Sequence, residues 1–373
     1  MKIKLCILII IVCSVALSCK EKFEPPAVKG SHNFLVVDGF LNSGGDSSVI
    51  LLSRTRNLGD TVTAIPELNA GMQLETDGGV VAFAANLGGG EYLFPALALP
   101  TSQNYRLRIS TSDGKEYLSR DMVVKTTPPI DSISYSYNDK GVTIYANSHD
   151  PSGNTRYYRY EYDETWEYHA PIFSELIYVG GIPPARGRLD DEWIYACYRS
   201  QSSHKIYLAS SAGLETDVIY QFPIQYIERN TEPLSVRYSI NVRQYALTKE
   251  AANYWTNLKK TTEELGSIFD AQPSQLRGNI SCLSDSTQPV LGFMSISSVE
   301  KKRMFIKRGE AGPWTYGEAC EVHNIPPDSF HIYFDLWHYE AISTHGLSNL
   351  DGAQAPCVDC RLKGGTTTKP DFW

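Results

Sequence analysis

Short runs of alternating hydrophobic and polar residues recur along the first third of the chain. They lie at residues 34–40, 48–53, 71–76, 80–84, 92–94, 105–110 and 117–124. A period of two predicts strands that bury one face. Turn residues such as Gly88-Gly89-Gly90 separate the runs. About seven strands in some ninety residues predict an immunoglobulin-like β-sandwich over residues 34–127.

Two short motifs divide this pattern. Asp113-Gly114, between two apolar runs, predicts a β-hairpin with a type I′ turn, in which both central residues have positive φ. Thr126-Thr127-Pro128-Pro129 predicts a domain boundary, because consecutive prolines cannot donate to a central strand and they stiffen the connection. We therefore expect a second domain over residues 128–373.

The second domain is also expected to be rich in β structure. Within residues 157–168, Tyr158, Tyr160 and Tyr162 point to one face of a predicted strand, and charged residues alternate with them. The order of strand, turn, strand, polar loop and aromatic strand is loosely similar to the start of a fibronectin type III domain. Further strands are predicted at residues 130–137, 142–146, 193–198, 205–209, 218–222, 234–245, 290–296, 303–307 and 330–335.

One helix is predicted over residues 249–265. Thr248 is a suitable N-cap and Gly266 fits the position after the last turn. An apolar stripe has helical spacing, and Trp255 within it is expected to pack the helix onto a sheet. The expected fold class is therefore mainly β, with two β-sandwich domains (immunoglobulin/fibronectin III-like) and one amphipathic helix in the second.

The first residues resemble a secretory signal. Lys2 and Lys4 precede an apolar run over residues 5–17, and its thirteen residues cover about 20 Å as a helix, short of a ~30 Å hydrocarbon core. The run ends in a stretch that resembles a bacterial lipobox, although its leucine, Leu17, lies two residues before Cys19 rather than three. We expect a signal peptide over residues 1–18, a lipid on Cys19 and a tether over residues 19–33. The alternative is an ordinary signal peptide with a chance cysteine.

Composition excludes some classes of protein. Hydrophobic residues make up 42% of the chain and charged residues 20%, which excludes wholesale disorder. The 34 basic and 42 acidic residues give a net charge of −8 without a basic cluster, so a nucleic-acid partner is not expected.

Five of the eight cysteines lie beyond the signal and the lipobox, at Cys197, Cys282, Cys320, Cys357 and Cys360. In an oxidising compartment they predict two disulfides and one free thiol, which allows fifteen arrangements. We expect Cys197 to be the free thiol, because the alternating sequence around it predicts a buried strand. The other four cysteines are expected to pair. The two cysteines nearest the C-terminus form a CxxC motif, which leaves a redox or zinc site as alternatives.

Motifs with a known chemistry are missing from the sequence, and neither a cofactor nor a metal is expected. The sequence contains no GxSxG, HExxH, phosphate-binding or EF-hand pattern. The histidines His323, His331, His338 and His345 are too evenly scattered to predict a metal site. Carboxylate groups at Glu161 with Asp163, and at residues 190–192, are compatible with a glycosidase acid and base or with solvated faces.

Aromatic side chains are the better candidates for ligand contact. On loops or on the polar face of a strand, they stack on sugar rings or anchor a protein partner. The alternative is that they pack in a tyrosine-rich core. The candidates are Trp166, Tyr168, Trp193 and Trp314.

Several stretches together resemble a known family. They are residues 35–39, 52–55, 113–117, 238–244 (YSINVRQ), 288–293 and the ending CVDCRLKGGTTTKPDFW. With the lipobox in front, their order is similar to that of the Bacteroidota lipoprotein family catalogued as domain of unknown function 4249. The resemblance implies an outer-membrane lipoprotein that is associated with a TonB-dependent transporter barrel and has no established catalytic residues. Lys20-Glu21 also resembles the acidic export signal of surface lipoproteins in that phylum.

The expected function is a surface-exposed, non-catalytic binding or accessory component of nutrient uptake. The chain would be held by its lipid at the outer membrane, facing the cell exterior, beside a TonB-dependent barrel protein. The first alternative is a stand-alone cell-surface adhesion or glycan-binding module. The second is a secreted hydrolase.

Overall fold

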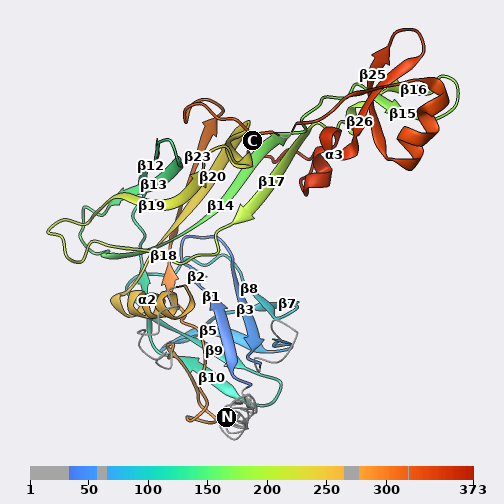
Figure 1. The fold of residues 1–373 in the computed structure, drawn as a ribbon. Coiled ribbons are helices and arrows are strands. Elements are labelled where there is room, and N and C mark those ends of the chain that lie inside the picture. The colour runs from blue at the N-terminus through green and yellow to red at the C-terminus, as the bar shows by residue number, and fades with distance from the viewer. Residues whose placement is uncertain (1–32, 57–64, 264–276, 318) are drawn as a thin grey trace, which may run out of the picture.

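The protein consists of three lobes that follow one another in space (Figure 1). The computed structural model describes residues 33–56, 65–263, 277–317 and 319–373. The signal peptide, Cys19 and the tether up to residue 32 therefore lie outside the described residues. The described chain is mainly β, as the sequence predicts, and the first two lobes each pair sheets in a sandwich-like arrangement.

The first lobe encloses one hydrophobic core between two sheets. One sheet has the order β1-β3-β8-β7, with β4 beside β3. Its strands are β1 (Leu35–Gly39), β3 (Ser48–Arg54), β4 (Ile65–Pro66), β7 (Ala85–Gly88) and β8 (Glu91–Phe94). The other sheet contains β2 (Leu41–Asn42), β5 (Gly71–Thr76), β6 (Gly79–Phe83), β9 (Asn104–Ser110), β10 (Glu116–Ser119), β11 (Met122–Lys125), β21 (Ile280–Cys282) and β22 (Ile296–Ser297).

Two strands of this lobe come from far along the chain. β21 pairs antiparallel with β10, where Tyr117 lies opposite Cys282. β22 pairs in parallel with both β2 and β11, and Met294 and Ile296 are buried in the same core. The predicted division at residue 127 assigns this returning segment to the second domain, whereas the structure assigns it to the first lobe. Short-range patterns carry no signal for such a long-range pairing.

The predicted hairpin at Asp113-Gly114 joins β9 and β10, but its turn type differs from the prediction. Only Gly114 has positive φ, at 79°. Its amide donates to the Thr111 carbonyl over 3.0 Å, and the Thr111 amide donates to the Lys115 carbonyl over 3.0 Å. This is the three-residue loop in which a type I turn is followed by a left-handed glycine.

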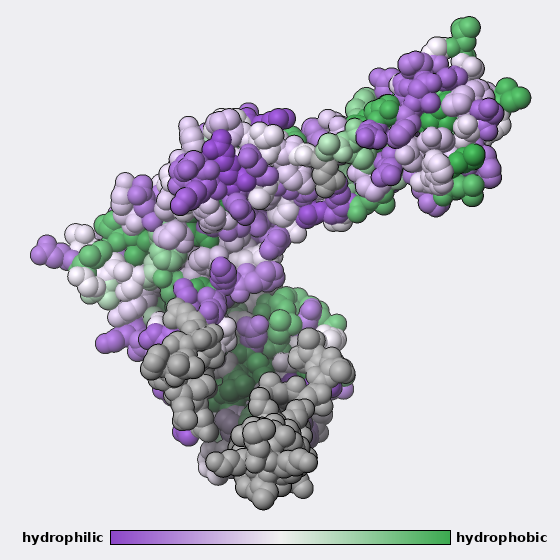
Figure 2. Space-filling model, viewed as in Figure 1, coloured by the Kyte–Doolittle hydropathy of each residue, from purple (hydrophilic) through white to green (hydrophobic). Residues whose placement is uncertain are grey.

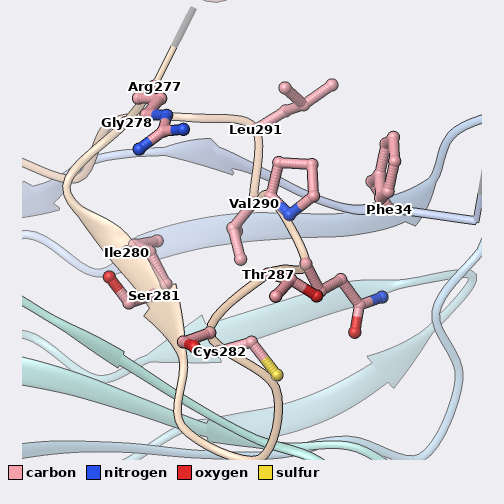
Figure 3. A pocket seen from close by; sticks show the side chains of 12 residues that line it. Phe34, Arg277, Gly278, Ile280, Ser281, Cys282, Thr287, Val290 and Leu291 are labelled. Atoms are coloured by element: carbon pink, nitrogen blue, oxygen red, sulfur yellow. The ribbon is translucent and has the colours of Figure 1, made fainter.

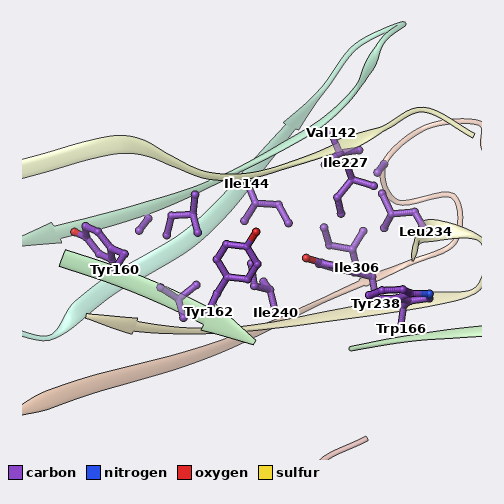
Figure 4. Close-up of a cluster of buried hydrophobic side chains, with 14 of the residues drawn as sticks. Val142, Ile144, Tyr160, Tyr162, Trp166, Ile227, Leu234, Tyr238, Ile240 and Ile306 are labelled. Carbon is purple, nitrogen blue, oxygen red and sulfur yellow. The ribbon is translucent and has the colours of Figure 1, made fainter. Parts of the chain in front are cut away.

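The second lobe packs a three-stranded sheet on a larger one. The smaller sheet contains β12 (Ile130–Tyr137), β13 (Gly141–His149) and β19 (Val218–Glu228). The larger contains β14 (Tyr157–His169), β17 (Ala196–Ser202), β18 (Tyr207–Ser210), β20 (Arg237–Ala246) and β23 (Val299–Lys307). Tyr158, Tyr160 and Tyr162 are all buried in the core between these sheets, which confirms the predicted alternation. Figure 4 shows Tyr160 and Tyr162 in this core.

The buried tyrosines of this core predict an alkaline limit to stability. Burial raises the pKa of Tyr160, Tyr162 and Tyr238 above the ordinary value. Above pH ~10 the unfolded chain therefore loses these protons first, and the free energy of unfolding falls as the pH rises. We expect a tyrosinate titration at 295 nm to leave a group of tyrosines protonated until the protein unfolds. Complete ionisation of all tyrosines in one step near pH 10, with the fold intact, would contradict this.

The predicted helix is confirmed as α2 (Lys249–Thr262). The last two residues of the predicted range, 264 and 265, lie outside the described residues. The Thr248 side chain caps it by accepting a hydrogen bond from the Ala251 amide. Trp255 packs in a small cluster beside β14, where the Arg159 guanidinium lies 3.9 Å from the centre of its ring. None of the described helices is both long and apolar enough to cross a bilayer.

A third, small lobe lies at the far end of the second (Figure 1). Its strands are β15 (Leu176–Tyr178), β16 (Ala185–Gly187), β24 (His323–Ile325), β25 (Tyr339–His345) and β26 (Asn349–Gln354). Short helical elements complete it and its neighbourhood: η1 (Asp190–Glu192), η3 (Pro327–Ser329), η4 (His331–Leu336), α3 (Ala355–Val358) and η5 (Cys360–Lys363), while η2 (Glu232–Leu234) lies in the second lobe. The strand predicted at residues 330–335 is wrong, because Phe330 and Phe334 face the lobe's core from helical turns.

The disulfides correct one prediction. Two disulfides and one free thiol are present among the described residues, as expected, but the pairs are Cys197 with Cys360 and Cys320 with Cys357. The free thiol is Cys282, which is buried in the core of the first lobe. The expectation that Cys197 is free is wrong, because the C-terminal segment returns beside β17 and brings Cys360 within a Cα separation of 5.8 Å.

Candidate functional site

An apolar surface on the first lobe is formed by β3 and its neighbours. In β3, Ile50 and Leu52 are buried in the core, whereas Val49 and Leu51 are 46% and 44% exposed on the outer side. An unbroken apolar run of this kind is typical of strands that are covered on both faces. The outer side of β3 thus has the composition of a contact surface.

The apolar surface continues across the neighbouring strands. Val49 lies opposite Leu93 of β8, which in turn lies opposite Ala85 of the edge strand β7. We call Val49, Leu51, Ala85 and Leu93 the β3 face. Figure 2 shows hydrophobic residues gathered over this part of the first lobe. Exposed apolar patches on soluble proteins mark interaction sites when they are contiguous.

The opposite sheet of the same lobe has a different outer surface. There Arg108 donates to Glu75 over 2.9 Å and to Glu116 over 3.3 Å. The hydrogen bond from Arg108 lowers the pKa of Glu75 and keeps its carboxylate ionised. This part of the opposite surface suits water, although β6 and β11 of the same sheet also expose apolar side chains, such as Phe83 and Val123.

Two acidic residues border the β3 face. Asp38 of β1 lies opposite Leu51, and Glu91 of β8 lies opposite Leu51 from the other side. No lysine or arginine lies on β1, β7 or β8, and Arg54 of β3 is buried. The border therefore favours a partner with neutral or basic groups and disfavours an anionic surface.

A cleft of about 540 Å³ lies where the first lobe meets α2. Asp38, Arg159 and Trp255 line it, together with Glu161, which the sequence offers as a catalytic acid or base. The Tyr245 hydroxyl donates to Glu161 over 2.6 Å, and Arg159 and Arg243 also pair with it. The two arginines therefore balance the charge of Glu161, which forms part of a polar sheet surface.

A second cavity, of about 600 Å³, lies near the start of the described chain (Figure 3). Phe34, Val290 and Leu291 line it, and so does the thiol of Cys282. Its lining mixes apolar residues with polar ones such as Arg277 and Gln288, and carries no carboxylate. The cavity has no arrangement of groups that points to a reaction.

Three of the four aromatic ligand candidates are core residues instead. Trp166, Tyr168 and Trp314 are all buried in the second lobe. Trp166 donates to Glu232 over 2.9 Å, Tyr168 donates to the Cys360 carbonyl over 2.8 Å, and Trp314 donates to the Thr231 carbonyl over 2.7 Å. Their predicted ligand role is wrong. Trp166 and Tyr168 lie an even number of residues from the buried tyrosines of β14, so their side chains point to the same, inner face of the strand. Trp193 is the exposed one.

The histidines do not gather. His331 pairs with Asp335 over 3.0 Å and His345 with Asp351 over 3.1 Å, each at the surface. Within the described ranges, no group of three or more potential metal ligands comes together.

The β3 face is the site that sequence reasoning missed. Its signal is the run Val49-Ile50-Leu51-Leu52, which interrupts the alternation seen in β9 and β14. A strand with apolar residues on both sides needs to be covered on both sides, and the described residues cover only the inner side.

Comparison with known proteins adds a family. No curated protein is significantly similar to the chain in sequence. A family model described as a domain of unknown function (DUF4249) matches residues 20–303, about three quarters of the chain. The chain belongs to the family of domain of unknown function DUF4249.

Proposed function

We propose that this protein is a surface-exposed outer-membrane lipoprotein of the Bacteroidota and a non-catalytic accessory of a TonB-dependent transporter. The observation that carries the proposal is the β3 face, an apolar sheet surface on the lobe that directly follows the anchor segment. The lipobox-like sequence before Cys19 supports the anchor. Family membership over residues 20–303 supports the comparison with lipoproteins of this type.

The direction of the chain supports a first lobe close to the bilayer. Asn33, the first described residue, lies at the end of this lobe where Leu35 pairs with Arg54. β1 then runs toward the second lobe, which it approaches at Phe40, whose ring centre is 4.7 Å from that of Tyr245. A lipid on Cys19 would therefore hold the first lobe nearest the membrane, with the other lobes extending away (Figure 1).

The length of the anchor segment supports a partner in the same membrane. The fourteen residues 19–32 span at most about 50 Å when fully extended. Such a short tether raises the effective concentration of the β3 face near a neighbouring membrane protein. Its acidic border argues against an anionic lipid surface as the main contact, so the partner is a protein.

Affinity purification in mild detergent tests this proposal. We expect the tagged wild-type protein to capture a TonB-dependent barrel that mass spectrometry identifies, and Leu51→Glu to lose it, because a buried unpaired carboxylate at the centre of an interface costs several kcal/mol. Val123→Glu is the matched control, since Val123 is 45% exposed on β11 in the opposite sheet.

Two results would overturn the proposal. One is purification without any barrel protein, which would favour the stand-alone adhesion or glycan-binding module. The other is equal capture by wild type and Leu51→Glu when both have the same melting temperature. For the hydrolase alternative, the candidate pair Glu161 and Asp163 is disfavoured, since both carboxylates are paired with Arg243.

A further inference from the structure

A groove of about 550 Å³ lies between the second and third lobes. Its walls come from three separate segments: the loop before β15, the segment from η1 into β17, and the C-terminal tail. We call it the Trp193 groove. It is lined by Phe173, Asp190, Asp191, Trp193, Tyr195, Ala196, Tyr198, Thr367 and Thr368.

Stacked aromatic rings form a platform in this groove. Phe173 and Trp193 are nearly parallel, at 14°, with ring centres 5.3 Å apart, and they are 45% and 37% exposed. Tyr195 supports Phe173 edge-on from 5.1 Å. The indole is therefore held in one orientation with part of its surface in water. A fixed, partly exposed pair of this size is typical of a site that receives a ligand.

Two carboxylates are among the polar groups of the groove. Asp190 and Asp191 make no hydrogen bond or salt bridge within the described residues, although the pKa of Arg186, which is raised mainly by its hydrogen bonds to Glu192, is also raised by the charge of Asp191. Their neighbour Glu192 differs: Arg186 donates to both of its oxygens over 2.6 Å, and this lowers the pKa of Glu192 to about 2. The oxygens of the two aspartates can thus accept hydrogen bonds from a ligand beside the aromatic platform.

The far wall of the groove is fixed to the second lobe. The Tyr198 amide donates to the Thr366 carbonyl over 2.7 Å, and the Thr366 amide donates back over 3.0 Å. The disulfide between Cys197 and Cys360 ties the same two segments together. The segment that carries Thr367 and Thr368 is therefore already fixed at the groove. Binding of a ligand would cost this segment little conformational entropy.

This combination selects among ligand classes. No lysine, arginine or histidine lines the groove, so nothing in it attracts a phosphate or carboxylate ligand. A pyranose ring has an apolar face of C–H groups and a rim of hydroxyl donors. The first matches an exposed aromatic face, and the second matches aspartate and threonine oxygens. We propose that the Trp193 groove binds a neutral saccharide through stacking on Trp193 and hydrogen bonds to Asp190 and Asp191.

Saturation-transfer NMR and calorimetry on the full mature protein test this inference. The probes are maltotriose, cellotriose, mannotriose and N-acetylchitotriose, with tetramethylammonium as a cationic probe. We expect at least one saccharide to bind, and Trp193→Ala to weaken it by more than about tenfold. The double variant Asp190→Asn/Asp191→Asn, at exposed positions of η1, is expected to weaken it by more than about fivefold. Trp337→Ala, at a 57% exposed tryptophan of the third lobe, is the control and should bind normally.

Three outcomes would overturn the inference. One is the absence of binding by all four saccharides, and another is saccharide binding that both groove variants leave unchanged. The third is binding of tetramethylammonium alone with loss in the double aspartate variant, which would make the groove a cation site. Because these measurements use the isolated protein, they fail or succeed independently of the capture of a membrane partner through the β3 face.

Discussion

Replacing Arg54 by alanine is expected to lower the free energy of unfolding by about 3–5 kcal/mol. Arg54 and Glu67 form an ion pair inside the first lobe, and their side chains are only 7% and 10% exposed. The Arg54 guanidinium also donates to the Tyr117 hydroxyl over 3.2 Å. Removal of the arginine leaves the Glu67 carboxylate buried without its partner. Urea unfolding followed by circular dichroism measures the loss.

Two further variants separate this effect from a general sensitivity of the lobe. Arg54→Met with Glu67→Leu removes both charges and is expected to cost far less than the single change. Arg108→Ala removes one of two arginines beside Glu75, because Arg106 lies 3.6 Å from the same carboxylate, and Arg108 itself is partly exposed, so this change should cost about 1 kcal/mol or less. If Arg54→Ala were as mild as Arg108→Ala, the buried pair would not stabilise the first lobe.

Removing the disulfide between Cys197 and Cys360 is expected to cost about 2–5 kcal/mol of unfolding free energy. It closes a loop of 163 residues and fixes the C-terminal segment to β17. The comparison is the disulfide between Cys320 and Cys357, which closes 37 residues. Chain entropy predicts that its loss costs about 1 kcal/mol less. The measurement is the unfolding free energy of each double-alanine variant.

The order of these two costs is the informative result. A larger loss for the shorter loop would show that loop entropy does not control the contribution of these bonds. Loss of the disulfide between Cys197 and Cys360 should also weaken ligand binding in the Trp193 groove, because it frees the segment that carries Thr367 and Thr368.

Local patterns in the sequence predict the local structure well. The alternation in residues 157–168 identifies β14 and the side that it buries, and Thr248 marks the first turn of α2. The hairpin at Asp113-Gly114 is also local, although only Gly114 takes the left-handed conformation. In each case neighbours within a few residues decide the outcome.

Long-range pairing accounts for what the sequence does not predict. Ile296 completes the first lobe from more than 150 residues beyond its last local strand, β11. Cys360 selects Cys197 as its partner only because the C-terminal segment folds back onto β17. No periodicity or composition encodes either contact, since both depend on how complete sheets pack.

The candidate sites follow the same division. Trp193 is found from its residue type, whereas Trp166 and Trp314 are of the same type but lie in the core. Residue type alone does not separate a stacking platform from a packed interior. The unbroken run around Leu51 is a local signal for the β3 face, but its meaning becomes clear only from the structure, in which the described residues leave the outer side of β3 exposed.

The most direct test of the account is the mass of the mature N-terminal peptide, from protein that is extracted from membranes. We expect the chain to start at Cys19 and the sulfur of this residue to carry a diacylglyceryl group. A chain that retains residues before Cys19, or one with a free thiol at that position, would contradict the membrane anchor and with it the accessory role at a transporter.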